Sequence, residues 1–201
     1  RVYLAGPIEL SQNPESWRNQ ITPKLQKLGI TVLNPLVKPA WMPNITGNIQ
    51  RSWKQYLATN VDFNIRYIQN NNHKVREFCM SLVRMADFII VKAEKDVVSY
   101  GTCEEISLAK SKPIFVISDD KIPSMWLIDQ LNIYTRLERK MYFHQSIETL
   151  IWKLRGINAG TVVVDNMKWI FLNYTGDHHV RHNLSSRSQS PKRRKRRHRR
   201  K

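Results

Sequence analysis

The chain has 201 residues, of which 41% are hydrophobic, and a formal net charge of +17. This length and composition predict one sizeable hydrophobic core and exclude two large domains. No apolar run approaches the roughly eighteen residues of a membrane-spanning helix, so we expect no membrane partner. Two cysteines, Cys79 and Cys103, are too few for a disulfide framework and indicate a reducing compartment. With no visible secretory signal, the expected location is the cytoplasm, or the nucleus in a eukaryotic host.

The first predicted elements are a strand, a glycine turn, a helix and a second strand. A short apolar run from Arg1 to Ala5 ends at Gly6-Pro7, where a glycine lets a ligand approach the backbone closely. A helix that ends at Gly29 follows, because apolar residues recur at helical spacing: Trp17, Ile21, Leu25 and Leu28. Residues 30–33 then return as a strand, so this order predicts a βαβ unit.

The middle of the chain, residues 44–86, is predicted to hold two helices before a third strand. Residues Trp53 to Ile68 indicate the first helix, and Asn70-Asn71-Asn72 is expected to interrupt it. A second, amphipathic helix is predicted from the spacing of Val75, Phe78, Cys79, Leu82 and Val83. It leads to the apolar run Phe88 to Val91, which is typical of a buried strand.

A short helix with two glutamates follows this third strand. Gly101 and Thr102 are expected to open it, which would place Glu104 and Glu105 in its first turn. There the helix dipole and unpaired backbone amides would keep both carboxylates ionised. Because α/β folds bind ligands at the carboxyl end of a parallel sheet, an ionised glutamate at this place is a candidate functional group. The alternative is that acidic residues simply favour helix starts.

The last elements complete an α/β pattern. A strand is predicted over Pro113 to Ile117, a short last strand at Tyr142-Phe143, and a closing helix over 147–154. We therefore predict a flavodoxin-like α/β domain over residues 1–157, with a mostly parallel five-stranded sheet and helices on both faces. Two β-rich runs within 161–174 predict an appended β-hairpin, in an extension over residues 158–180.

Much of the charge lies in a basic tail, residues 181–201. The tail holds 11 Lys or Arg and no acid, so residues 1–180 carry only +6 of the net +17. Like charges repel, and residues 191–201 contain no apolar side chain able to join a core, so the tail is predicted to be disordered. Nine of the ten residues from 192 to 201 are Lys or Arg. This density favours nonspecific nucleic-acid contact or nuclear import over a general solubility role.

Six short segments together resemble the nucleoside 2-deoxyribosyltransferase superfamily, particularly its phage-type members and its nucleotide N-glycosidase branch. In chain order they are YLAGPI, Trp17-Arg18, VLNP, ADFIIV, SYGTCEEISLA and KPIFVI. The resemblance covers about residues 1 to 155. The resemblance implies an enzyme that cleaves or transfers at the N-glycosidic bond of a (deoxy)nucleoside or nucleoside 5′-monophosphate. It also implies a homo-oligomer, because relatives complete their sites across subunits.

The resemblance assigns roles to particular residues. Glu105, rather than Glu104, corresponds to the nucleophile of the family. Tyr3 corresponds to the tyrosine that holds the carboxylate of this nucleophile, and Gly6 with Pro7 corresponds to the turn that lies against the sugar. A carboxylate below the sugar can capture the oxocarbenium-like anomeric centre covalently. A second group must then protonate the departing base, because a purine or pyrimidine anion is a poor leaving group.

Further substrate contacts are expected around the start of the glutamate helix. Ser99 stands where many members carry an aspartate and where the nucleotide N-glycosidases carry a phosphate-binding serine. Together with the amides near Gly101 and Thr102 it favours a nucleotide over a nucleoside, the alternative being a simple loop serine. Asp87 matches a family position at the start of the third strand, with capping or pairing at a strand edge as its competing role. Asp96 is a candidate contact to the sugar hydroxyls.

One departure from the family concerns the proton donor to the base. Cys79 stands where relatives usually carry the acid aspartate. Either Glu77 or Asp62 takes over this role, or the activity is altered or lost. In the second case the chain is a nucleotide- or nucleic-acid-binding module of the same fold. No cofactor is implied, and residues 177–182, which hold an aspartate and three histidines, have no standard zinc spacing, so we expect no metal.

Overall fold

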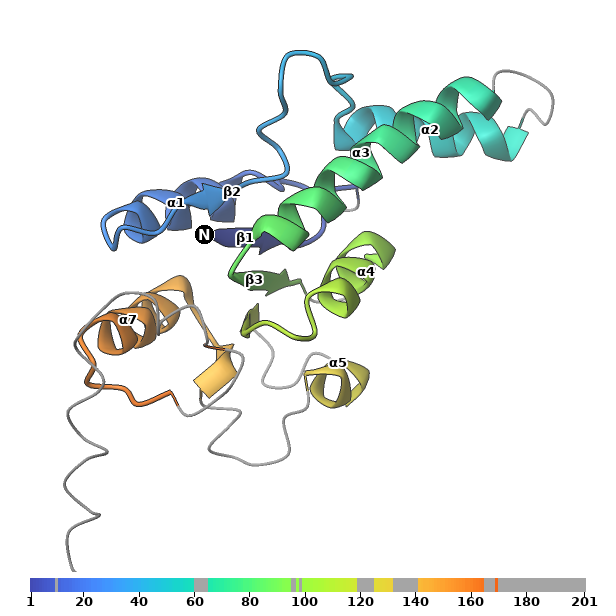
Figure 1. Cartoon of the computed structure of the whole chain (residues 1–201). Helices are drawn as coiled ribbons and strands as arrows, with labels where there is room; N and C mark the ends of the chain where they lie inside the picture. The colour runs from blue at the N-terminus through green and yellow to red at the C-terminus, as the bar shows by residue number, and fades with distance from the viewer. Residues whose placement is uncertain are drawn as a thin grey trace, which may run out of the picture.

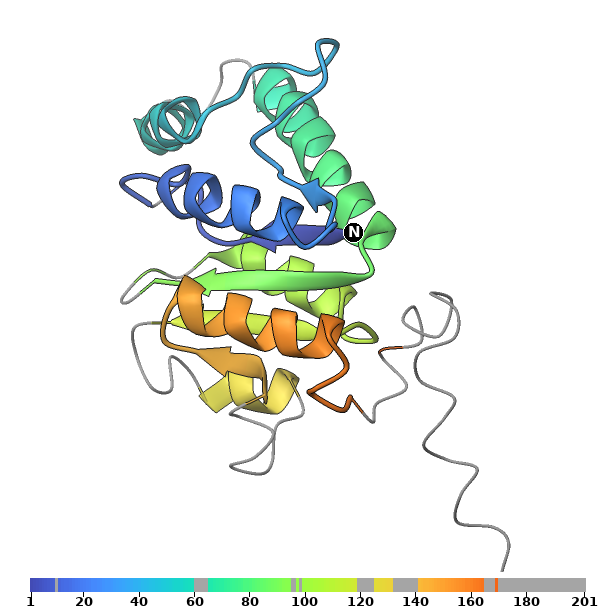
Figure 2. The same ribbon diagram turned by 90° about the vertical axis from the view of Figure 1, so that its left-hand side faces the viewer.

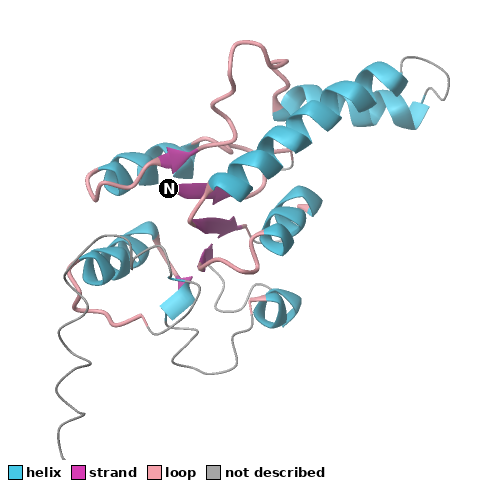
Figure 3. Ribbon diagram, in the orientation of Figure 1, coloured by secondary structure: helices cyan, strands magenta, loops and turns pink. Residues whose placement is uncertain are grey.

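Five parallel strands form one sheet in the order β2-β1-β3-β4-β5 (Figures 1 and 3). The computed structural model describes residues 1–9, 11–59, 65–94, 97, 99–118, 125–131, 141–164 and 169. The strands are β1 (Val2–Ala5), β2 (Val32–Leu33), β3 (Phe88–Ala93), β4 (Ile114–Ser118) and β5 (Phe143–His144). The helices are α1 (Ser16–Gln26), α2 (Gly47–Thr59), α3 (Ile65–Met85), α4 (Tyr100–Leu108), α5 (Met125–Gln130) and α7 (Ile147–Asn158).

The strand order confirms the predicted flavodoxin-like α/β fold. Val2 of β1 pairs with Val32 of β2 on one side and with Phe88 of β3 on the other. The chain therefore moves outward from β1 in both directions, which makes the space beyond the carboxyl ends of β1 and β3 the topological switch point. Open α/β sheets bind their ligands at such a place.

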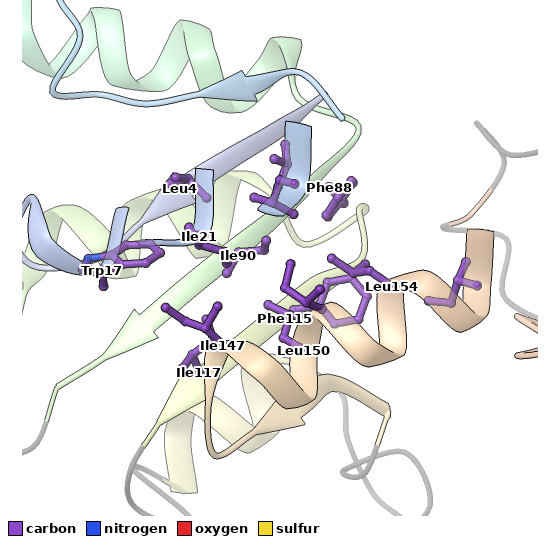
Figure 4. Close-up of a cluster of buried hydrophobic side chains, with 14 of the residues drawn as sticks. Leu4, Trp17, Ile21, Phe88, Ile90, Phe115, Ile117, Ile147, Leu150 and Leu154 are labelled. Carbon is purple, nitrogen blue, oxygen red and sulfur yellow. The ribbon is translucent and has the colours of Figure 1, made fainter. Parts of the chain in front are cut away.

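Helices cover both faces of the sheet, and each face has its own apolar cluster. Helices α1 and α7 lie together on one face (Figure 2) and bury Ile21, Leu150 and their neighbours against Leu4, Ile90 and Phe115 (Figure 4). Helices α3, α4 and α5 pack on the other face, against the side chains that alternate with these along the strands. Because strand side chains alternate between faces, Tyr3 of β1 points to the α3 and α4 side, between Val2 and Leu4, which point to the α1 and α7 side.

The long helix α3 corrects one sequence expectation. The prediction that Asn70-Asn71-Asn72 interrupts a helix is wrong, because α3 runs unbroken from Ile65 to Met85. The side-chain amide of Asn71 is buried and donates to the carbonyl of Tyr67, one turn earlier, at 2.9 Å. An internal bond of this kind satisfies the asparagine inside the helix. Together with α2, which buries no side chain, the first part of α3 projects beyond the sheet (Figure 1).

The segment after α7 differs from the predicted hairpin where it is described. Residues 161–164 form no strand; the backbone amides of Thr161 and Val162 instead donate to the carbonyl of Gly156 and close the end of α7. The rest of the expected hairpin, apart from Trp169, and the whole basic tail lie outside the described residues. Trp169 packs into the α1 and α7 cluster. Within the described part of the chain, none of the helices has the length and hydropathy to cross a bilayer.

Candidate active site

A buried tyrosine and a buried glutamate face each other between the sheet and α4. The hydroxyl of Tyr3 donates to Oε1 of Glu105 at 2.5 Å, although 102 residues separate them in the chain. Their exposed fractions are 0% and 6%. Strand β1 directs Tyr3 to this side, and α4 packs on β1 with Glu105 turned inward. The structure therefore brings together the two residues that the resemblance assigns to the nucleophile and its partner.

The two adjacent glutamates of α4 point to different environments. Glu104 is partly exposed and binds the guanidinium of Arg76 on α3 through both carboxylate oxygens, with one contact at 2.9 Å. Arg76 also contacts Glu77, its neighbour on α3, at 2.9 Å. Only Glu105 of this pair turns toward Tyr3.

The helix α4 begins earlier than the sequence predicted. Ser99 caps it: its Oγ accepts from the backbone amide of Thr102 at 3.3 Å and from the Thr102 hydroxyl at 2.9 Å. Because serine is a strong N-cap residue, the first turn is Tyr100 to Thr102, and the expectation that Glu104 and Glu105 lie in the first turn is wrong. Glu105 is therefore too far along the helix for unpaired amides to stabilise its charge.

Burial dominates the electrostatics of Glu105. Removal from water raises its pKa from 4.5 to about 7, while the hydrogen bond from Tyr3 and the positive charge of Arg18 oppose this shift. Burial, and not the helix dipole as expected, therefore governs the ionisation of Glu105. Burial, and then the charge of Glu105, raise the pKa of Tyr3 well above 10, so the phenol keeps its proton and donates it to the hydrogen bond.

Arg18 is a buried cation behind the turn after β1, and the sequence analysis did not identify it as a site residue. Its guanidinium donates to the carbonyls of Pro14 at 2.5 Å, Gly6 at 3.1 Å and Leu4 at 3.4 Å. It also lies 4.7 Å from the centre of the Trp17 ring. Arg18 therefore holds the Gly6 turn in place and brings a positive charge close to Glu105.

Gly6 is required by packing in this turn. A Cβ atom at this position would meet the carbonyl oxygen of Lys92 and the ring of Trp17, each at 3.2 Å. The pair Trp17-Arg18 thus fixes the backbone beside the site, which gives a structural reason for this dipeptide in the sequence.

Cys79, the residue in the place of the family's acid, lies next to the pair. It is 8% exposed on α3 and lies close enough to Tyr3 for the two side chains to interact. Burial, and then the charge of Glu105, raise the pKa of Cys79 to about 11, so the thiol stays protonated at neutral pH. The positive charges of Lys38 and Arg18 act on the same thiol in the opposite direction.

The structure does not bring Glu77, one of the two alternative acids, to Tyr3 and Glu105. Glu77 is about half exposed and binds Arg76 on the outside of α3. Asp62 lies outside the described residues. Of the three residues considered for the acid, only Cys79 is described beside Tyr3 and Glu105.

A cavity of about 230 Å³ opens at the carboxyl end of β3 and the turn after β1, between α4 and α5. Pro7, Ser99 and Thr102 line it, as the expected substrate contacts, and Trp126 of α5 closes one side. Helix α4 thus presents Thr102 to the cavity and Glu105 to Tyr3. The side of α4 that faces the cavity is next to the side that faces Tyr3.

The remaining predicted contacts lie elsewhere. Gly101 is exposed in the first turn of α4, with no atom within 4 Å of where a Cβ would stand. Asp87 lies at the opposite, amino-terminal edge of the sheet, where its carboxylate contacts the backbone nitrogen of Arg1 at 2.5 Å. Asp96 lies outside the described residues. Among the described residues, no group of three or more His, Cys, Asp or Glu side chains is arranged to hold a metal.

Comparison with known proteins gives one family match. Residues 1–101 match the family described as nucleoside 2-deoxyribosyltransferase like. A solved structure of a 2-deoxyribosyltransferase from the psychrotolerant bacterium Bacillus psychrosaccharolyticus is similar at 15% sequence identity. Its similarity covers 75% of this chain and 89% of that chain, with a TM-score of 0.47. No curated protein matches the sequence.

Proposed function

The chain belongs to the nucleoside 2-deoxyribosyltransferase-like family, and from its site we propose that it cleaves or transfers at the N-glycosidic bond of a (deoxy)nucleoside or nucleoside 5′-monophosphate. The observation that carries this proposal is the 2.5 Å contact between Tyr3 and the buried carboxylate of Glu105. A buried carboxyl group with a raised pKa and a dedicated donor is a frequent mark of a catalytic site.

The proposed reaction has two steps at the anomeric carbon. The carboxylate of Glu105 bonds to this carbon while the carbon–nitrogen bond to the base breaks, and the base leaves with the electron pair and takes up a proton. In the second step another base, or water, attacks the same carbon, loses a proton and restores the carboxylate. Tyr3 and Arg18 favour the ionised form of Glu105, which is the form that attacks.

The substrate is proposed to reach this carboxylate from the cavity beside α4. Pro7, Ser99 and Thr102 border that cavity, and Gly101 leaves open space at the helix start. A 5′-phosphate is proposed to lie at the start of α4, where backbone amides favour anions. Asp96 is kept as a proposed contact to the sugar. For Asp87 the pairing with Arg1 at the far edge favours a structural role.

The proton donor distinguishes this proposal from its rival. The rival is a nucleotide- or nucleic-acid-binding module of the same fold, and the observation that favours it is Cys79, whose thiol has a pKa of about 11 and is a weak acid. Glu77 forms an ion pair with Arg76, and this contact favours neither of the two functions.

A homo-oligomer is part of the proposal. Large apolar side chains are exposed around the cavity: Tyr100 at 88%, Trp126 at 86% and Met125 at 70%. Exposed aromatic groups beside a site are typical of surfaces that a second subunit covers. Light scattering on the eluting protein tests this part, and a monomer at micromolar concentration would contradict it.

The test of the function is incubation of the full chain with a panel of nucleosides and 5′-monophosphates, with and without a second base. Chromatography then measures free base and exchanged nucleoside. We expect free base, or exchange, from at least one substrate, and none from the Glu105→Gln variant. Calorimetric binding of a monophosphate without any turnover over long incubation would support the binding module instead.

A further inference from the structure

A groove on the other face of the sheet has no part in the proposed reaction. It runs between α1 and α7, with a volume of about 670 Å³, and Lys24, Lys27, Trp152 and Arg155 contribute to its lining. Figure 2 shows these two helices side by side on the face turned toward the viewer. The sheet separates the groove from Tyr3 and Glu105, which lie on the α3 and α4 side.

The groove is basic. Lys24 forms an ion pair with Glu148 at 2.7 Å, and Glu148 is the one acid among the described residues that line it. No ion pair joins Lys27 or Arg155 to another residue in the described part of the chain, and both side chains are exposed. Two positive charges are therefore left to attract an anionic partner.

An exposed tryptophan stands beside these charges. Trp152 on α7 is 69% exposed, although large aromatic side chains normally lie in the core. The ammonium of Lys153 lies 6.0 Å from its ring centre. A flat ring next to cations is the combination that binds single-stranded nucleic acid, because bases stack on the ring while the cations contact phosphates.

The last described residue before the basic tail lies on the same side of the domain. Trp169, the last described residue, is buried in the α1 and α7 cluster, where its ring stacks on Phe88 at 6.5 Å and meets Phe115 at 5.7 Å. Residues 170–201 continue from that point, and residues 181–201 hold 11 Lys or Arg. The groove and Trp169, the last described residue before the basic tail, therefore share one face of the sheet.

We propose that the groove between α1 and α7 binds single-stranded nucleic acid, with Trp152 stacking on a base and Lys27 and Arg155 contacting phosphates. The binding expected for residues 192–201 would then continue onto the folded domain. A concave groove fits a strand of nucleic acid better than the plane of a bilayer. This inference is independent of the proposed reaction, because none of its residues lies near Glu105.

The test measures the binding of the full chain to a fluorescein-labelled oligothymidylate by fluorescence anisotropy at several salt concentrations. Trp152→Ala is expected to weaken binding about fivefold or more, which corresponds to the loss of one stacked base. Replacement of Lys27 and Arg155 together by glutamine is expected to lower the slope of log affinity against log salt by about 1.4, as for two lost phosphate contacts. Trp41→Ala and Lys74→Gln, which change exposed residues far from the groove, are the matched controls and should bind within about twofold of the unchanged chain.

Three outcomes would overturn the proposal. One is unchanged affinity and salt slope in the groove variants, which would assign all binding to the tail. Another is that Trp152→Ala weakens binding to a DNA duplex as much as binding to oligothymidylate, because paired bases are not available for stacking. The third is that Trp152→Ala weakens binding to phosphatidylserine vesicles and leaves oligothymidylate binding unchanged, which would identify the groove as a membrane-binding surface. Thermal melting of each variant shows whether the fold is retained.

Discussion

The phenol of Tyr3 on β1 donates a hydrogen bond to the carboxylate of Glu105 on α4, and neither side chain has appreciable contact with water. The bond does not fully compensate for burial, since the pKa of Glu105 is still raised to about 7. A carboxylate held in this way costs folding free energy. Apolar residues would fill the same space more favourably. A buried carboxylate that lowers stability in this way is typical of functional sites.

Replacement of Glu105 by glutamine is expected to abolish base release, because an amide cannot bond to the anomeric carbon. The loss of kcat should be about a thousandfold or more. Glu104→Gln is the matched control, and it should keep most of the activity because Glu104 points outward to Arg76. Rates of base release under saturating substrate make the comparison. Activity in the Glu105 variant together with loss in the Glu104 variant would reverse the assignment of the nucleophile.

Tyr3→Phe is expected to move the pH dependence of the reaction. The hydrogen bond from Tyr3 lowers the pKa of Glu105, so its removal raises that pKa above about 7. The acid limb of kcat/KM against pH reports the pKa of the free enzyme, and it should move to higher pH by on the order of one unit. Activity should then be reduced more at pH 6 than at pH 8. An acid limb that stays in place would show that Tyr3 does not act on Glu105.

The same pKa shift predicts a gain of stability when the site is disabled. The folded state holds the proton of Glu105 more tightly than the unfolded state, so ionisation destabilises the fold as pH rises from 4.5 to about 7. Glu105→Gln removes this penalty. Its free energy of unfolding should exceed that of the unchanged chain by up to about 3 kcal/mol near pH 8, with no difference below pH 4.

Glu104→Gln is the control for this comparison, because its free energy of unfolding should not rise at high pH. The hydrogen bond from Arg76 lowers the pKa of Glu104, so its ionised form is favoured in the folded state and its loss should bring no gain at high pH. Urea unfolding at several pH values measures both variants. A Glu105→Gln variant that is less stable than the unchanged chain at pH 8 would contradict the raised pKa.

The fold could be predicted from the sequence because apolar runs and helical spacing depend on neighbours along the chain. The runs at residues 88–91 and 113–117 are buried strands, as expected. Ser99 and Asn71 show where local patterns failed, since a cap moved the start of α4 and an internal hydrogen bond carried α3 through an asparagine run. In both cases a polar side chain formed a hydrogen bond with the helix backbone. Ser99 starts α4 in this way, and Asn71 allows α3 to continue.

The site could be predicted only in part, for a different reason. Glu105 and Tyr3 follow from a resemblance to relatives, and their contact joins segments far apart in the chain. Arg18 could not be identified as a buried cation, because arginine on a helix is usually exposed and only the turn after β1 covers it. Likewise the sequence could not show that Cys79 faces Tyr3 while Glu77, two residues earlier, faces outward.

Cys79→Asp is expected to raise the rate of base release if the missing acid limits the reaction. An aspartate beside Glu105 would share its low-dielectric surroundings, so one of the two carboxyl groups would keep a proton near neutral pH. A positioned acid typically contributes a factor of about 100 or more. Cys79→Ser, which supplies no acid, should bring no gain. A loss of activity in both variants would show instead that the thiol takes part in the reaction.

Ser99→Asp is expected to reverse the preference for phosphorylated substrates. The unchanged chain should turn over 5′-monophosphates with a higher kcat/KM than nucleosides, because Ser99 and the start of α4 border the cavity and carry no carboxylate there. The one acid among the described residues that line the cavity, Glu94, accepts a hydrogen bond from Ser11. The nearby Glu104 is neutralised by Arg76, so it opposes a phosphate only weakly. Aspartate is as good an N-cap as serine, so the substitution keeps the helix start while it adds a charge that repels the phosphate.

The size of this effect and its control can be stated from the same geometry. A carboxylate near a dianion should lower kcat/KM for the monophosphate by about tenfold or more and leave nucleoside turnover nearly unchanged. Ser99→Asn retains an N-cap without the charge and should keep more of the monophosphate activity than Ser99→Asp. Steady-state kinetics on one nucleoside and its 5′-monophosphate measure the ratio for all three proteins. Equal loss of both substrates in Ser99→Asp would mean that Ser99 acts only as a cap, and a nucleoside preference in the unchanged chain would place the phosphate elsewhere.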